Sequence, residues 1–222
     1  MIYLGINLAV MPISLGLCDD HHEIGQISVT PNHAYNEDLI IHLKSLCQIN
    51  QLNLDQIQCV GITQGPGSYT GLRIGVTFAK TLCQIQQIPL YGFSTLEAFV
   101  FQYRTFDGLY LVVLPACKNE VNTALFGVKN LKINRLTPDL TCPISRIQEH
   151  LPQFTEKIYV IGDVPMPIPS PIQVISGKSL LGCTLAQMAK EQPYQNGDYK
   201  TVFPIYSHLP TLNSKYTKHP SQ

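Results

Sequence analysis

A glycine-rich loop between a buried strand and an amphipathic helix is the feature that most constrains this chain. The apolar run 59–63 predicts a strand, and the apolar periodicity of residues 72–85 predicts a helix. The loop between them contains Gly65, Pro66, Gly67, Ser68, Tyr69, Thr70 and Gly71, and Arg73 follows in the first turns of the helix. A strand, a glycine loop and a helix in this order are typical of the ligand-binding edge of an α/β fold.

The loop residues have local structural reasons of their own. Glycine permits positive φ and close backbone approach, and Pro66 fixes its φ and ends the strand. Ser68 or Thr70 can cap the helix, whose N-terminus could also receive an anion. However, the loop lacks a P-loop lysine and the glycine spacing of a dinucleotide fingerprint, and Thr70 replaces the last glycine of a hydrolase elbow. By itself, the loop favours a structural turn.

The composition excludes several function classes. Fifteen acidic and 15 basic residues give a net charge of zero, which argues against a broad nucleic-acid-binding surface. The seven cysteines form no Cys-x-x-Cys pair, so we expect buried, reduced thiols rather than zinc ligands or disulfides. His33 and His42 cannot share a helical face, so no metal site is predicted. With no charged leader and no apolar run of about 18 residues, we expect a cytoplasmic protein that does not cross a membrane.

The order of the elements predicts two lobes. Strands are predicted at 2–6, 13–18, 26–29, 59–63 and 88–91, with helices at 34–50, 72–85 and 94–104. We predict a first lobe at residues 1–106, a second lobe at 107–210 and a mobile tail at 211–222. In the second lobe, strands are predicted at 109–114, 123–128, 131–136 and 157–161, with helices at 143–151 and 178–191. The proline-rich run 164–171 is predicted to be an extended connector.

The loop read as a whole, Gly-Pro-Gly-Ser-Tyr-Thr-Gly-Leu-Arg-Ile-Gly at 65–75, closely resembles the signature of the YeaZ/TsaB family. Members of that family are the dimerisation subunit of the bacterial complex that makes N6-threonylcarbamoyladenosine in tRNA. The resemblance implies an α/β fold of the actin-like ATPase or ribonuclease-H-like class, with two lobes of which the second has diverged. Residues 201–206 are also similar to the family's short C-terminal Pro-x-Tyr segment.

Two predicted hairpins depart from the family pattern. Asn7-Leu8-Ala9 stands where the family usually has Asp-Thr-Ser, and a neutral amide lacks the anionic oxygen that Mg²⁺ prefers. The second hairpin, at 115–122, keeps an alanine, a glutamate and a valine of the family pattern but loses its aspartate, arginine, glycine and tyrosine. We therefore expect no independent phosphoryl transfer and predict no catalytic residue. Whether the altered hairpins keep any family contacts stays open.

The helix after the glycine loop has an apolar sector wider than packing on a sheet requires. Its excess face, centred on Ile74 and Phe78, either packs under the other lobe or meets a partner chain. The resemblance favours the partner, because the family pairs through the helices of its first lobe. The expected interface comprises Glu37, Leu39, Ile40, Leu43, Leu46, Leu72, Ile74, Gly75, Val76, Phe78, Ala79 and Leu82.

The resemblance implies a non-catalytic scaffold that supports threonylcarbamoyl transfer to the tRNA adenosine next to the anticodon. Its partners would be an actin-like catalytic sister of the TsaD type and a P-loop ATPase of the TsaE type, and tRNA would be reached only through the complex. No cofactor is expected on this chain alone, while ATP or ADP could bind at a subunit interface.

Two other functions stay open. The chain could be an ATP-dependent transferase of the sugar-kinase type, with Asp19, Asp20, Asp107 and Asp163 as its candidate acids. It could also be a self-associating protein with no connection to tRNA, using the same helices. The sequence does not separate a homodimer from a heterodimer.

Overall fold

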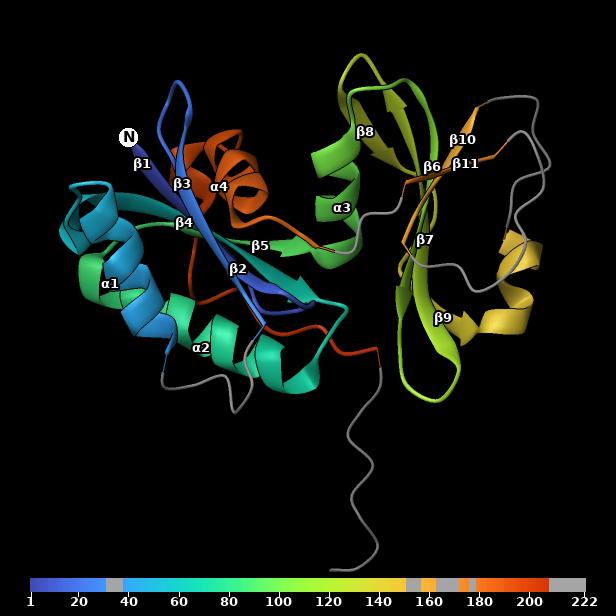
Figure 1. Cartoon of the computed structure of the whole chain (residues 1–222), viewed down its shortest axis with the longest axis horizontal. Coiled ribbons are helices and arrows are strands. Elements are labelled where there is room, and N and C mark those ends of the chain that lie inside the picture. The colour runs from blue at the N-terminus through green and yellow to red at the C-terminus, as the bar shows by residue number, and fades with distance from the viewer. Residues whose placement is uncertain (31–37, 151–156, 163–171, 176–178, 208–222) are drawn as a thin grey trace, which may run out of the picture.

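Two sheets lie side by side in the chain, each with its own set of covering elements (Figure 1). The computed structural model describes residues 1–30, 38–150, 157–162, 172–175 and 179–207. The first sheet has the strand order β3-β2-β1-β4-β5. Its strands are β1 (Ile2–Asn7), β2 (Ile13–Cys18), β3 (Glu23–Val29), β4 (Ile57–Gly65) and β5 (Leu90–Ser94). The first three are antiparallel neighbours, whereas β4 is parallel to β1 and β5 is parallel to β4.

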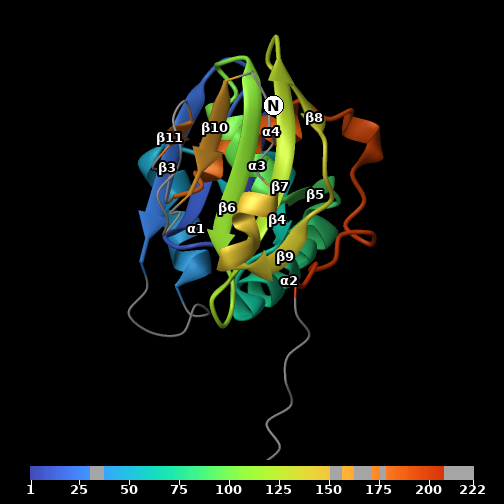
Figure 2. The same cartoon turned by 90° about the vertical axis from the view of Figure 1, so that its right-hand side faces the viewer.

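The second sheet repeats this pattern. Its strands are β6 (Gly108–Pro115), β7 (Glu120–Lys129), β8 (Lys132–Arg135), β10 (Ile158–Ile161) and β11 (Gln173–Ile175), in the order β11-β10-β6-β7-β8 (Figure 2). Here β6, β7 and β8 are antiparallel, and β10 and β11 are parallel to β6. One further strand, β9 (Leu140–Pro143), pairs with β7. This repeated topology is the actin-like fold with two lobes that we expected, and β9 is one of the features in which the second lobe has diverged.

The helices divide the two faces of the first sheet between them. Both α1 (Leu39–Ile49) and α2 (Tyr69–Gln86) pack on one face, and α4 (Gly182–Lys190) packs on the other (Figure 1). Between the sheets lies α3 (Thr95–Tyr103), which contacts strands of both and α4. Short 3₁₀ helices occur at Leu54–Gln56, Ile144–His150 and Tyr194–Asn196.

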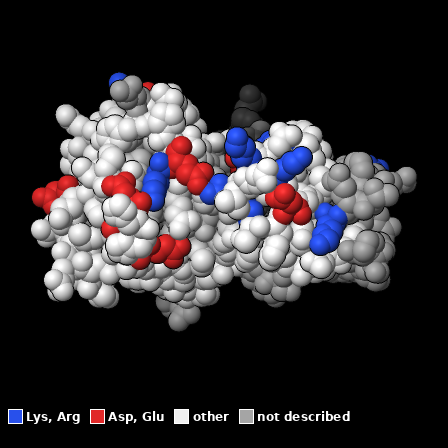
Figure 3. Space-filling view, turned by 90° about the horizontal axis from the view of Figure 1, so that it is seen from above, with Lys and Arg blue, Asp and Glu red and all other residues white. Residues whose placement is uncertain are grey.

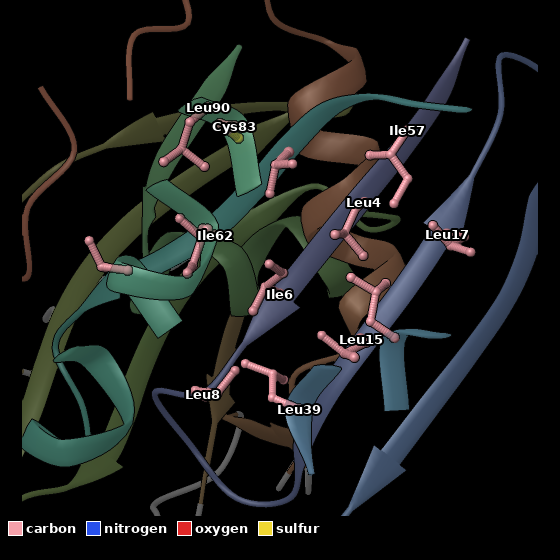
Figure 4. Close-up of a cluster of buried hydrophobic side chains, with 14 of the residues drawn as sticks. Leu4, Ile6, Leu8, Leu15, Leu17, Leu39, Ile57, Ile62, Cys83 and Leu90 are labelled. Atoms are coloured by element: carbon pink, nitrogen blue, oxygen red, sulfur yellow. The ribbon is translucent and has the colours of Figure 1, made fainter. Parts of the chain in front are cut away.

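Period-two alternation in β1 and β2 builds the core under α1 and α2. Leu4 and Ile6 of β1 point to the same side as Leu15 and Leu17 of β2, and all four are at most 3% exposed (Figure 4). Leucines of α1, of which Leu39 is labelled in the figure, close over them. Burial of each such side chain contributes about 1.5–3 kcal/mol to folding.

The alternate positions of the same strands are glycines, and α4 lies directly on them. Gly5 pairs with Gly16 on one side and with Gly61 on the other, so the three form a row across β2, β1 and β4. A Cβ added at Gly5 would lie 1.9 Å from the carbonyl oxygen of Gly182, and one added at Gly61 would lie 2.3 Å from that of Leu185. The backbone of α4 therefore approaches the sheet more closely than any side chain would allow.

Most predicted elements occur, with shifted ends. The strand expected at 13–18 spans those residues, and the helix expected at 72–85 begins at Tyr69. The helix predicted at 143–151 is wrong: Pro143 ends β9, and Ile144–His150 is a 3₁₀ helix. Strands β9 and β11 were not predicted, because each is short and contains or closely follows a proline, which argues against a strand.

The division into lobes after residue 106 stays a proposal. The structure adds that α4, which lies in the predicted second lobe, packs on the first sheet. The proline-rich run 164–171, the tail 211–222 and the first residues of the helix predicted at 34–50 lie outside the described residues.

Replacing Gly5 or Gly61 by alanine tests the glycine row. We expect each variant to lose about 3 kcal/mol or more of the free energy of unfolding, because the new methyl group meets backbone atoms that move only if α4 moves. Urea unfolding followed by circular dichroism measures this. Gly127→Ala in β7 is the control, since its Cβ would meet only the Leu136 side chain at 3.8 Å. Similar losses at all three positions would contradict the packing described here.

Candidate functional site

The glycine loop is held against the turn between β1 and β2. A Cβ at Gly67 would lie 2.4 Å from the carbonyl oxygen of Ala9, and one at Gly71 would lie 1.9 Å from that of Leu8. The amide of Ser68 donates a hydrogen bond to the Ala9 carbonyl at 2.8 Å. These glycines are therefore required by close contact between two backbone segments of the same chain.

The start of the loop is bound by the C-terminal part of the chain. Gly65 has φ +128°, and a Cβ there would lie 2.0 Å from the Ile205 carbonyl oxygen. The amide of Ile205 donates to the carbonyl of Gln64 at 2.6 Å. Residues 201–206, which resemble a family segment in sequence, thus lie against the end of β4.

Ser68 is the capping residue of α2. Its Oγ accepts a hydrogen bond from the amide of Gly71 at 3.2 Å, whereas the other candidate, Thr70, is exposed in the first turn. The cap satisfies one of the free amides of the helix N-terminus.

The polar side of α2 contacts the same C-terminal segment, residues 201–206. Lys80 donates to the Val202 carbonyl at 3.1 Å, and its Nζ lies 4.1 Å from the centre of the Phe203 ring. The ring of Tyr69 packs on Tyr206 at 4.7 Å between centroids. Arg73 lies over the same Tyr69 ring, 5.4 Å from its centroid. The polar side of α2 is therefore engaged within the chain.

Asn7, at the end of β1, forms a fully used hydrogen-bonding centre. Its Nδ2 donates to the carbonyls of Val10, Pro12 and Leu180 at 3.1–3.3 Å. Its Oδ1 accepts from the amides of Ala9 and Val10. An aspartate could accept from the same amides but could not donate to the three carbonyls. The residue that departs from the family pattern is thus fitted to a structural task.

A cleft of about 340 Å³, which we call the interlobe cleft, lies between the lobes. Its lining comes from the turn after β1, the glycine loop after β4, the end of β6, the start of β7 and the residue after β10. It consists of Ala9, Val10, Met11, Pro66, Gly67, Ser68, Leu114, Pro115, Asn122 and Gly162. The carboxyl ends of parallel strands are where ligands bind in open α/β sheets. No residue of this described lining has a charged side chain. Within the described part of the chain, no cluster of three His, Cys, Asp or Glu side chains could bind a metal ion.

Three of the four candidate acids of the transferase alternative are described, and none of these three lines the cleft. Asp19 accepts from the backbone amides of His22 and His21, and these bonds hold the pKa of its carboxyl below the usual value. Asp20 pairs with the terminal amine, which lowers its pKa as well. Asp107 accepts from the amide of Asn130 at 2.8 Å, and residue 163 lies outside the described residues. The acids that can be described therefore serve local structure.

The expected interface residues fall into two groups. Seven are buried in the chain's own core: Leu39, Leu43, Leu46, Leu72, Gly75, Val76 and Ala79. Ile40 is exposed, and Ile74, Phe78 and Leu82 are half-buried at the edge of the first core. Residue 37 lies outside the described residues. Only the second group has surface that another chain could contact, and the interface itself stays a prediction.

The structure adds exposed isoleucines that the sequence analysis missed. Ile85 is 76% exposed and continues the stripe of Ile74, Phe78 and Leu82 along α2. On α1, Ile41 and Ile49 are 55% and 74% exposed. Together these residues form what we call the helix face: Ile41, Ile49, Ile74, Phe78, Leu82 and Ile85. Ile85 could have been found from its spacing, since it stands seven positions after Phe78 on the same side of the helix.

The cysteines are free thiols, and most of them are buried. All seven are free, and only Cys117 is exposed. Burial raises the pKa of Cys59, Cys83 and Cys183 to about 12, so these thiols stay protonated at neutral pH.

Charges of both signs are mixed on one face of the described surface. In Figure 3, acidic and basic residues are interspersed on the face shown. Among the described residues, no helix is both long enough and apolar enough to span a bilayer.

Comparison with known proteins identifies the family. Residues 26–189, well over half of the chain, match the model of the TsaD family, tRNA N6-adenosine threonylcarbamoyltransferase. The tRNA threonylcarbamoyladenosine biosynthesis protein TsaB of Bacillus subtilis (strain 168) is 33% identical over 132 residues, which cover 59% of this chain and 56% of that protein. The chain belongs to the TsaD family, among its YeaZ/TsaB proteins. It spans little more than half the length of the curated TsaB relatives that it matches first.

Solved structures confirm the fold of this YeaZ/TsaB chain. YeaZ from Pseudomonas aeruginosa superimposes with a TM-score of 0.78 at 15% identity, covering 92% of this chain and 99% of that one. A second structure, described as an uncharacterized protein with similarity to peptidase YEAZ from Pseudomonas aeruginosa, gives a TM-score of 0.81 at 15% identity and covers 93% and 99%. At such identity the likeness shows the actin-like fold alone.

Asn7→Asp restores the acid of the family pattern and tests the role of the amide. We expect a loss of about 3–5 kcal/mol at neutral pH, because a buried carboxylate would face three carbonyl oxygens. The pKa of the new carboxyl would be raised in the folded state, so the loss would be small near the unfolded pKa of about 3.9 and grow as pH rises above it. Urea unfolding across this pH range, with wild type as reference, measures the difference. A loss independent of pH would contradict this account.

Ser68→Ala and Thr70→Ala compare the two capping candidates. We expect Ser68→Ala to lower the free energy of unfolding by about 1 kcal/mol, because the Gly71 amide loses its acceptor. Thr70→Ala, in the same turn but without the capping bond, should change it by less than about 0.5 kcal/mol. Chemical denaturation of both variants decides the point. Equal effects would remove the role given to Ser68.

Proposed function

We propose that this chain is a non-catalytic partner subunit in the biosynthesis of threonylcarbamoyladenosine in tRNA. It would dimerise through the helix face with an actin-like catalytic sister of the TsaD type, which would carry out the transfer to the adenosine next to the anticodon. A P-loop ATPase of the TsaE type would join the same assembly, and ATP or ADP would bind between subunits. Support comes from the family membership and from the TsaB relatives, which are named tRNA threonylcarbamoyladenosine biosynthesis proteins.

The observation that carries the proposal is the apolar stripe left exposed on α1 and α2. Ile41, Ile49 and Ile85 are each more than half exposed. Full burial of an isoleucine contributes about 1.5–3 kcal/mol, so covering all three against a partner would stabilise a complex substantially. Exposed apolar side chains on helices that cover the same face of a sheet are typical of a protein interface.

The uncharged cleft supports the non-catalytic part of the proposal. Among the described residues that line the cleft, none has a charged side chain. The chemistry would take place on the sister subunit, and this chain would supply the surface that positions it. The three candidate aspartates that the structure describes do not line the cleft, which counts against the transferase alternative.

Ile85→Glu and Ile41→Glu test the helix face. Both side chains are exposed, so we expect little change in the stability of the isolated chain but a loss of association of at least about tenfold, because a charge would be desolvated in the interface. The measurement is co-elution with the purified TsaD-type protein of the same organism at micromolar concentration. Gln84→Glu is the matched control, because it adds the same charge in the same helical turn on the polar side of α2.

Three outcomes would count against the proposal. The wild-type proteins could elute separately, or the Gln84 control could weaken association as strongly as Ile85→Glu. A chain that pairs only with itself through the same residues would favour the self-associating alternative. Depletion of the protein in cells then supplies a second test, since unchanged threonylcarbamoyladenosine in tRNA would remove the link to modification.

A further inference from the structure

A hollow of about 790 Å³ lies on the second sheet, at the opposite end of β6 from the interlobe cleft. We call it the lysine hollow. It occupies the region where β7 turns into β8, near the top of Figure 1, whereas α1 and α2 lie at the lower left of that view. A partner bound to the helix face therefore need not cover it.

Three lysines line the lysine hollow, and Asp107 is the one acid in its described lining. Lys129 and Lys132 stand directly opposite each other in the pairing of β7 with β8, and Lys157 precedes β10. All three lysines are exposed, and no acid in the described part of the chain forms an ion pair with them. Asp107 accepts from the backbone amide of Asn130 at 2.8 Å. Like charges directly opposite each other destabilise a sheet, so a bound anion would relieve the repulsion.

We infer that the lysine hollow binds the phosphate backbone of RNA. Lysine and asparagine side chains are among the groups that contact nucleic-acid phosphates, and Asn130 and Asn134 line the hollow together with the lysines. Gly127, which pairs with Asn134, adds no side chain to the hollow, and a Cβ there would meet only the Leu136 side chain at 3.8 Å. The lysines therefore border open space that a phosphate can enter.

The choice of RNA as the ligand rests on the proposed function, because the TsaB relatives are named for the biosynthesis of a tRNA nucleoside. An acidic protein surface would satisfy the same lysines, and the test below separates it from RNA. Since the chain has no net charge, three lysines give only a weak contact. In the proposed assembly this contact would add to the hold of the catalytic sister on the same tRNA.

The test is fluorescence anisotropy of a labelled tRNA transcript titrated with the isolated chain at 20–100 mM KCl. For three phosphate contacts we expect a Kd of about 10⁻⁴ M near 20 mM salt, and a slope of log K against log salt of about −2 to −3. Lys129→Gln and Lys132→Gln should each weaken binding at least about fivefold and reduce the slope by about one. Asn134→Lys, which adds a cation at an exposed position of the same hollow, should strengthen binding about tenfold and steepen the slope by about one.

Lys200→Gln is the matched control, because it removes the same charge from an exposed lysine outside the hollow and should change binding by less than about twofold. Urea midpoints confirm that each variant folds. The inference is overturned if wild type does not bind tRNA near 20 mM salt, if Lys200→Gln weakens binding as much as the hollow variants, or if Asn134→Lys brings no gain. Tighter binding of labelled poly-L-glutamate through the same lysines would also overturn it, in favour of an acidic protein.

The outcome is distinguishable from that of the proposed function. The hollow variants should still co-elute with the TsaD-type protein, because the lysine hollow lies away from the helix face. Co-elution without tRNA binding would remove this site and leave the partner proposal standing. Binding of tRNA by a chain that does not co-elute would remove the partner proposal and leave the site.

Discussion

The close seating of α4 on a row of glycines is the contact on which the rest of the structure depends. Gly5, Gly16 and Gly61 leave no side chains on that part of the sheet, so the helix backbone fills the space. The approach to α4 is fixed as well, because the carbonyl of Leu180, two residues before the helix, accepts from Asn7 and from the Ser14 hydroxyl. A helix from the last quarter of the chain therefore completes the first sheet, and residues 1–106 alone would leave one face of it bare.

This seating assigns different tasks to the two faces of the first sheet. One face is used up by backbone contact with α4, and the other is covered by the leucines of α1 and α2. Since both faces are filled from within the chain, the outer sides of α1 and α2 are free to carry apolar residues that the core does not need. Ile41, Ile49 and Ile85 lie there, more than half exposed. The helix face therefore lies on the sides of α1 and α2 that do not pack against the sheet.

The sequence predicted the parts of this structure that repeat along the chain with a clear period. The strand at 13–18 and the helix after the glycine loop follow from alternation and from capping chemistry, and the loop signature identified the family. By contrast, β9 and β11 are short and contain or closely follow a proline, so their sequences do not indicate a strand. The interlobe cleft could not be predicted, because its walls come from five separate segments whose approach depends on tertiary packing. Seven expected interface residues are buried in the chain's own core. The apolar sector of a helix does not show which of its residues pack inside the chain and which stay on the surface.

Asn7 joins the first hairpin to the segment that leads into α4. In the family pattern an acidic residue occupies this turn, and acids are suited to metals and to phosphate chemistry. An amide at the same place can donate to Leu180 and to two carbonyls of its own turn, so it binds the entry of α4 to the first hairpin. The amide adds a donor that holds the approach to α4, at a buried position that is not among the residues lining the cleft. Because a carboxylate at this position could not donate to these carbonyls, the departure from the family pattern goes together with the way in which α4 closes the first sheet.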